Sequence, residues 1–260
     1  MRSIKNLVVL AAVFRFMSNT PASAGPIVCD LTTTSSCAIN GGIFSVFEVH
    51  PTGTGVIDSF VRVQDKGDEA GYNTSYRKVQ FDEKKDPNHT RDLGIAEVGT
   101  TTFGGVEYAT FYLDINEPAS GDKQLITLDE LELFTTDLPM RTGYSGVPNT
   151  ASGELPGTTK VYDLDWGGDN YVQLSYNQIG GGSGSSDMVF YLPMALFTGE
   201  YVNLYSEFGD LDESPNKSKS EAGFEEWFTL QSLAITSVPE PATLVLVSLG
   251  LLGGARRRKG

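Results

Sequence analysis

From Ile43 onward the chain consists of short runs of β-branched and aromatic residues, separated by Gly, Asn, Asp and Pro. Such runs favour strands. The interruptions favour turns, because Gly accepts positive φ and Pro cannot extend a central ladder. No stretch shows a convincing 3.6-residue apolar period, so helices are not indicated. We expect strands near 43–49, 55–64, 76–81, 106–115, 125–134, 159–166, 170–178, 187–192, 201–207 and 225–235.

The spacing of these runs is typical of an all-β protein, an antiparallel β-sandwich of the jelly-roll kind. A chain of 260 residues can hold one large domain or two small ones. We expect one sandwich over residues 25–237. The Pro- and Gly-rich stretch 137–157 is then a long loop, or alternatively the connection between two halves.

The charge of the chain excludes one class of partner. Acidic residues number 33 against 19 Lys and Arg, and the formal net charge is −14. Basic residues concentrate at the two ends, so the region between them is more acidic still. Such a surface repels nucleic acid and anionic lipid and favours solubility and cation binding. We therefore expect no nucleic-acid partner.

The first 24 residues have the parts of a secretory signal peptide. Arg2 and Lys5 form a charged start, and an apolar run follows at 7–14. Ala22 and Ala24 supply the small residues of a cleavage site. We expect export across the inner membrane and a mature chain that begins at Gly25.

Cys29 and Cys37 lie just inside that expected mature start. In an exported chain two cysteines at this spacing can close a small disulfide loop. A loop so short removes little entropy from the unfolded chain and stabilises by about 2–3 kcal/mol at most. The alternative is a pair of free thiols, because sequence does not reveal bond geometry.

Residues 238–260 read VPEPATLVLVSLGLLGGARRRKG and differ in character from the acidic body. The apolar part, 242–255, is shorter than the roughly 20 residues with which a helix crosses a bilayer. The basic cluster 256–259 would stay on the cytoplasmic side. Two prolines hold the preceding segment extended and accessible. This order of parts is typical of C-terminal sorting tails that are recognised and removed.

These residues resemble the PEP-CTERM sorting signal of Gram-negative bacteria that make extracellular polysaccharide. The resemblance is carried by Val238, Pro239, Glu240, Pro241, Arg256, Arg257, Arg258 and Lys259. It implies a short C-terminal hydrophobic helix that anchors transiently in the inner membrane, and processing by an exosortase with Glu240 at the recognition core. It also implies delivery to the cell surface or the exopolysaccharide matrix. Body segments such as 128–134 are similar to those of other proteins with this signal.

One acidic turn is a candidate cation site. Asp163 and Asp165 share one side of an expected strand, and the Gly-rich turn after Trp166 could bring Asp169 near them. Calcium is the cation that such oxygen ligands would select. The run lacks the Glu that closes an EF-hand loop, because Leu174 stands at that position. The alternative is a solvated acidic face on an edge strand.

A second acidic group, Asp129, Glu130 and Glu132, lies within the expected strand 125–134. Glu130 and Glu132 share one face, and like charges on one face repel each other unless water or a cation separates them. We expect this face to be solvated.

Four tyrosines are candidates for sugar binding: Tyr108 and Tyr112 on one expected strand, and Tyr201 and Tyr205 on another. Exposed rings on a sandwich face stack on sugars, and neighbouring hydroxyls and amides orient them. The alternative is that these rings belong to the core or to cross-strand pairs.

Catalytic motifs are missing from the sequence. There are two histidines, and no nucleophile elbow, zinc-binding helix or Cys–His pattern. We therefore expect an exported, non-enzymatic protein of the cell surface or exopolysaccharide matrix. A carbohydrate-binding module with calcium-stabilised loops is the alternative, and a hydrolase using two of the many carboxylates comes third.

Overall fold

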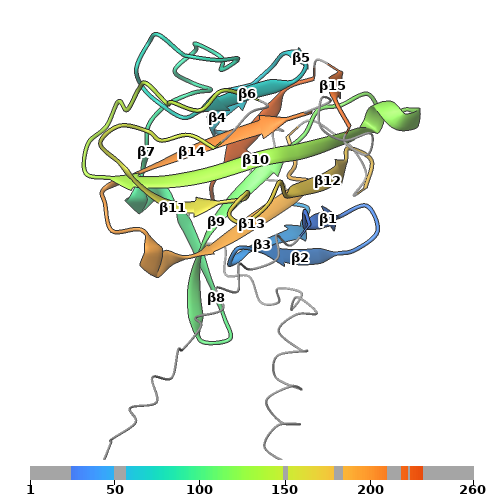
Figure 1. Ribbon diagram of the computed structural model, residues 1–260, viewed down its shortest axis with the longest axis horizontal. Coiled ribbons are helices and arrows are strands. Elements are labelled where there is room, and N and C mark those ends of the chain that lie inside the picture. Colours follow the sequence, from blue (N-terminus) through green and yellow to red (C-terminus); the bar gives the residue numbers. More distant parts are fainter. Residues whose placement is uncertain are drawn as a thin grey trace, which may run out of the picture.

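The computed structural model describes residues 25–49, 57–148, 152–178, 184–209, 218–221 and 223–230. The expected signal peptide, 1–24, and the sorting signal with its short helix, 238–260, lie outside the described residues. Within them the regular secondary structure consists mainly of strands, as Figure 1 shows. The short 3-10 helices are η1 (Ile95–Glu97), η2 (Gly121–Gln124) and η3 (Met194–Leu196). No helix among these residues is long and apolar enough to cross a bilayer.

The strands form two seven-stranded sheets and a small ribbon. Sheet A contains β1 (Val28–Asp30), β6 (Glu69–Tyr72), β7 (Leu93–Gly94), β10 (Leu125–Thr136), β11 (Thr159–Asp163), β12 (Tyr171–Ser175) and β14 (Tyr201–Phe208). Sheet B contains β2 (Ser36–Ile39), β3 (Gly42–Val46), β4 (Ser59–Val63), β8 (Gly99–Phe103), β9 (Val106–Asp114), β13 (Met188–Pro193) and β16 (Glu225–Phe228). The ribbon pairs β5 (Lys66–Gly67) with β15 (Ser220–Glu221).

One apolar core joins the two sheets and confirms the predicted sandwich. Sheet B contributes Phe44, Phe111, Phe190 and Trp227, and sheet A contributes Leu131, Leu133, Val172 and Leu204. The Trp227 indole N–H also donates a hydrogen bond of 3.0 Å to the Ser206 hydroxyl, from sheet B to sheet A. Since each strand alternates its side chains, every second residue of the central strands faces this core.

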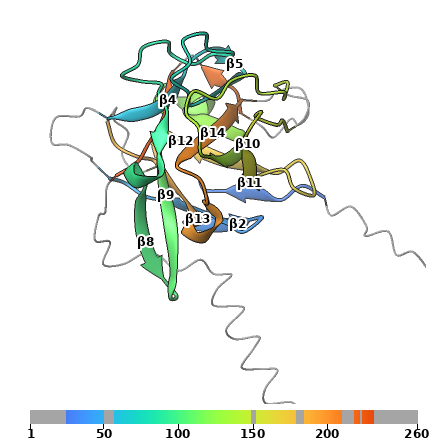
Figure 2. The same ribbon diagram turned by 90° about the vertical axis from the view of Figure 1, so that its left-hand side faces the viewer.

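Two long strands organise the sheets. β10 pairs with β14 along one edge, and with β12 and then β11 along the other. β9 pairs with β13 on one edge, and with β8 and then β16 on the other. The hairpin of β8 and β9 extends beyond the other strands in both views of the molecule (Figures 1 and 2). All pairs are antiparallel except β1 with β12, so sheet A is mixed.

The N-terminal arm links the sheets at one edge. β1 belongs to sheet A and β2 to sheet B, and a disulfide between Cys29 and Cys37 joins them, with Cα atoms 6.0 Å apart. The bond therefore closes a short loop and also connects the two layers of the sandwich.

The expected strand over 76–81 is wrong. This segment contains no strand and belongs to a loop that packs over sheet A. Arg77 holds the loop by donating hydrogen bonds to four backbone carbonyls, among them those of Lys85 and Thr90. Phe81 packs edge-on against Tyr72, Tyr144 and Tyr205 instead of joining a ladder. Strands over 28–30, 36–39, 69–72 and 99–103 were not expected and are present.

Candidate functional site: buried carboxylates on sheet A

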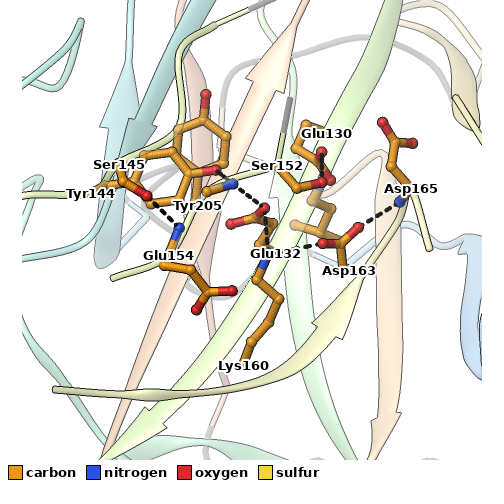
Figure 3. Close-up of polar contacts among 12 residues, drawn as sticks. Glu130, Glu132, Tyr144, Ser145, Ser152, Glu154, Lys160, Asp163, Asp165 and Tyr205 are labelled. Carbon is orange, nitrogen blue, oxygen red and sulfur yellow. Dashed lines mark hydrogen bonds and ion pairs between the residues drawn. The ribbon is translucent and has the colours of Figure 1, made fainter. Parts of the chain in front are cut away.

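Buried ionisable side chains gather on the outward face of sheet A, where β10 lies between β11 and β14 (Figure 3). We call this group the sheet A cluster; it comprises the buried Glu130, Glu132, Asp163, Glu207, Tyr144 and Tyr205, together with the half-buried Lys160. The strand register brings these residues together. Glu130 lies opposite Glu207, and Glu132 lies between Tyr205 and Asp163.

A bulge in β11 places Lys160 and Asp163 on the same face. In a regular strand, residues three apart point to opposite faces. Here the register shifts so that Leu133 pairs with Tyr162 while Phe134 pairs with Lys160. The extra residue turns Lys160 outward beside Asp163, while Tyr162 keeps its ring in the core.

Lys160 bridges two carboxylates. Its Nζ lies 2.9 Å from Glu132 Oε1 and 2.9 Å from Asp163 Oδ2. Burial raises the pKa of Glu132 to about 7, although the contact with Lys160 lowers it. Burial lowers the pKa of Lys160, but its hydrogen bonds to Asp163 and Glu132 outweigh this and raise the pKa overall. Lys160 is therefore a charged group, and it compensates the negative charge of this half of the cluster.

Glu130 forms the more strongly perturbed half of the sheet A cluster. Burial, and then the charges of Asp165 and Asp163, raise the pKa of Glu130 to about 10, so this carboxyl is neutral at pH 7. The Ser152 hydroxyl donates a hydrogen bond of 3.0 Å to it. On β14, the strand that pairs with β10, the Tyr205 hydroxyl donates a hydrogen bond of 2.9 Å to Glu207.

The expectation that Asp129, Glu130 and Glu132 are solvated is wrong, because all three are buried. The loop between β10 and β11 folds back over the sheet. Its Tyr144 ring stacks on Tyr205 with centroids 4.2 Å apart. Its Gly153 amide donates a hydrogen bond of 2.9 Å to Glu132. The stretch 137–157 thus joins two neighbouring strands of sheet A, and its described residues, among them Tyr144 and Gly153, cover their acidic side chains.

The sheet A cluster contains a pair of carboxyls with separated pKa values, a pattern that can serve acid–base chemistry. Glu130 would be the proton donor and Glu132 the carboxylate. The side chain of Glu132 has no exposed surface, however, and the loop occupies the space above it. In this conformation the carboxyls hold the loop to the sheet through hydrogen bonds from Ser152 and Gly153.

The aspartates of the expected cation site instead build a turn. Asp163 Oδ1 accepts a hydrogen bond of 2.8 Å from the Asp165 amide, and Asp165 Oδ1 accepts one of 2.8 Å from the Asn170 amide. Asp163 also binds Lys160, and Asp169 is exposed. Within the described ranges, no three His, Cys, Asp or Glu side chains stand ready as the ligands of a metal ion. Asp163, Asp165 and Asp169 are therefore not gathered into a ligand set.

Two of the four expected sugar-binding tyrosines are buried, so that part of the expectation is wrong. Tyr112 stacks on Phe228, and Tyr205 on Tyr144. Tyr108 is half-buried and lies flat against Phe103, with ring centroids 4.1 Å apart. Tyr201 is also half-buried and lies opposite Thr136 in the register of β10 and β14.

Sequence reasoning missed Lys160 and several buried carboxylates elsewhere. Asp114 and Asp187 are both buried, and the Asp187 carboxylate accepts a hydrogen bond of 2.9 Å from the Ile115 amide. In the sequence, the only hint of this contact is that Lys160 lies three residues before Asp163. Regular strand alternation would place these two side chains on opposite faces. Only the bulge reveals the contact.

Comparison with known proteins adds a linear motif to this picture. Residues 237–259 match the family model described as the PEP-CTERM protein-sorting motif. No curated protein and no solved structure matches the chain. The chain thus carries a signal for export and for sorting through an exosortase, and this signal lies outside the described part of the structure.

Proposed function

We propose that this chain is a non-enzymatic protein of the cell surface or exopolysaccharide matrix of a Gram-negative bacterium, sorted and processed through its C-terminal signal. The observation that carries the proposal is the motif at 237–259. The tail would hold the chain in the inner membrane transiently, until an exosortase removes it. The β-sandwich would then be the delivered part, with a structural or adhesive task in the matrix.

The loop that covers the carboxyls of sheet A supports a non-enzymatic role. The carboxyls with separated pKa values lie beneath the loop between β10 and β11, where Gly153 and Tyr144 occupy the space above Glu132. Gly153 fits there because a side chain at this position would overlap the Gly146 backbone. A polysaccharide substrate could reach the pair only by displacing this packed loop.

A carbohydrate-binding module is the second candidate, and a polar hollow favours it. The hollow is lined by Thr135, Thr136, Asp137, Gly157, Thr158, Thr159, Thr198 and Gly199. Tyr201 lies directly opposite Thr136, on the same face of sheet A. Hydroxyl groups beside a half-buried ring suit a neutral sugar unit. Of the four tyrosines, Tyr201 is therefore the one that this candidate function retains.

The test of sorting is the mass of the C-terminal peptide after expression in a host that contains an exosortase. We expect a mature end near 239–243, with the apolar run removed. Replacing Pro239, Glu240 and Pro241 together by Ala should leave the tail intact, because the recognition segment is lost. Thr236→Ala, one residue upstream of the matched segment, should be processed normally.

An intact end at 256–259 in wild-type chain, recovered in the membrane fraction, would contradict the proposal. The tail would then be a plain anchor. Turnover of a polysaccharide by the purified protein would contradict the non-enzymatic part separately.

A further inference from the structure

The outward face of sheet B is apolar, whereas strands of a sandwich ordinarily turn polar side chains outward. Tyr112, Tyr191 and Phe228 lie on this face, because their neighbours along the strands, such as Phe111 and Trp227, point into the core between the sheets. The three outward rings are 1%, 0% and 1% exposed. Sheet A lies against the opposite face and does not cover them. We call these rings, together with Ile43, Ile57 and Val189, the outer patch.

The outer patch has a half-buried apolar rim. Five side chains pack against the patch and stay partly exposed: Phe47, Val49, Phe103, Tyr108 and Leu230. The Tyr191 hydroxyl is buried and has no hydrogen-bond partner among the described residues. Soluble proteins seldom leave a large apolar surface uncovered or a buried hydroxyl unpaired. Both features fit a further segment that brings apolar side chains and one hydrogen-bonding group.

The chain leaves β16 at the outer patch. β16 pairs with β9 as far as Phe228, and β8, which begins at Gly99, pairs with the next part of the same edge of β9. The chain after Phe228 therefore cannot continue along β9. The Gly99 amide donates a hydrogen bond of 2.8 Å to the Thr229 hydroxyl, and a Cβ atom at Gly99 would overlap the Leu230 carbonyl oxygen. This close contact turns the chain off the edge of β9, and the Leu230 side chain joins the rim of the outer patch.

We propose that residues 231–236, the linker between the sandwich and the matched sorting motif, pack on the outer patch and cover it. The linker reads QSLAIT and follows Leu230 directly. Leu233 and Ile235 are two residues apart, so an extended chain presents both to one side. Gln231 and Ser232 carry groups that can pair with the Tyr191 hydroxyl.

The length of the linker matches the width of the outer patch. Six extended residues span about 20 Å. The patch extends over four neighbouring strands, β3, β13, β9 and β16, which are separated by three gaps of about 4.8 Å each. A linker that starts at β16 can therefore reach β3.

A second stretch outside the described residues also adjoins the outer patch. Residues 50–56 lie between Val49 and Ile57 and read HPTGTGV. They offer one large aliphatic side chain, Val56, where the linker offers two. The linker is therefore the better cover for an apolar face.

Packing of the linker would make it part of the mature sandwich and would hold the sorting signal near sheet B. Pro239 lies three residues beyond the linker, within about 11 Å of its packed end. An exosortase would then cleave close to the folded domain instead of on a free tether. This consequence rests on the proposed function, whereas the packing itself does not.

The test is hydrogen exchange and oxidative labelling of the full-length chain, both measured by mass spectrometry. In wild-type chain the amides of 231–236 should exchange at least about tenfold more slowly than unprotected amides, because the linker must leave the patch before they exchange. Oxidation of Tyr191 should be low. Replacing Leu233 and Ile235 together by Asp should remove the amide protection and raise Tyr191 oxidation severalfold, because a carboxylate does not pack against an apolar rim.

The matched control replaces Leu244 and Leu246 together by Asp, which makes the same change in the apolar run beyond the linker. It should leave linker protection and Tyr191 oxidation at wild-type values. If the control pair exposes Tyr191 and the linker pair does not, the apolar run covers the patch and the proposal is overturned. It is also overturned if the folded linker variant keeps the wild-type Tyr191 oxidation, as expected of a cover formed by 50–56.

Two outcomes with wild-type chain overturn the proposal without any variant, so the test holds even if the Asp pair fails to fold. One is exchange of 231–236 at the unprotected rate. The other is protection that is lost on dilution, which would assign the cover to a second copy of the chain. None of these readings requires the tail to be processed, so a failed sorting test and a failed packing test are distinguishable.

Discussion

At the scale of single residues, Lys160 determines whether the sheet A cluster is stable. It contacts Glu132 and Asp163 at 2.9 Å each, and both carboxylates are buried. Lys160→Met should lower the free energy of unfolding by about 3–5 kcal/mol, because it leaves buried carboxylates without their cation. Urea denaturation of the folded chain at neutral pH measures this loss.

The matched control at this scale is Lys123→Met. The Lys123 side chain is 61% exposed and lies 3.9 Å from Glu221. Its replacement should cost less than about 1 kcal/mol, because water already screens the pair. Equal losses in the two variants would show that Lys160 does not stabilise the cluster through its charge.

At the scale of elements, the N-terminal arm is held by the disulfide as well as by strand pairing. β1 makes only a three-residue parallel pairing with β12, and β2 pairs with β3 in the other sheet. Replacing Cys29 and Cys37 by Ser should therefore lower the free energy of unfolding by about 2–3 kcal/mol. Thermal unfolding with and without reductant checks this value.

Reductant should destabilise wild-type chain by the same amount and leave the double variant unchanged. Hydrogen exchange in β1 should accelerate most in the double variant, because few other contacts hold that strand. A reductant effect that persists in the double variant would contradict this account, since these are the two cysteines of the chain.

At the scale of the whole molecule, buried carboxyls make stability depend on pH in an unusual direction. Burial raises the pKa of Glu132 to about 7 and that of Asp187 to about 8, from ordinary values of 4.5 and 3.8. Between the ordinary and raised values the folded chain retains protons that the unfolded chain has lost. The free energy of unfolding therefore falls as pH rises through this range.

We expect the chain in EDTA to be more stable near pH 5 than near pH 8, by on the order of 3 kcal/mol from Glu132 alone. Denaturant unfolding across this range measures the slope. Glu132→Gln should make the slope shallower, because its proton no longer titrates. Stability that rises steadily between these two pH values would contradict the raised pKa values of these buried carboxyls.

Strands could be predicted from the sequence where the residues favour extended backbone and also alternate toward a buried face. The runs at 106–115, 125–134 and 201–207 became β9, β10 and β14, because β-branched and aromatic residues alternate there toward one core. The run at 76–81 has a similar composition but became a covering loop. Its Phe81 is partly buried against aromatic rings of sheet A without pairing to a neighbouring strand. Local strand preference does not reveal whether a short apolar run joins a sheet as a strand or packs over the sheet as a loop.

The sorting signal and the all-β class are properties of the sequence itself. An exosortase signal is a linear set of residues, and strand periodicity depends on neighbours along the chain. The environment of each carboxylate was decided by the tertiary structure alone. Glu132 meets Lys160 through a bulge, and Glu225 meets Glu69 across two sheets. Burial, charge pairing and pKa depend on atoms that are distant in sequence, so alternation could identify a shared face and could not show what covers it.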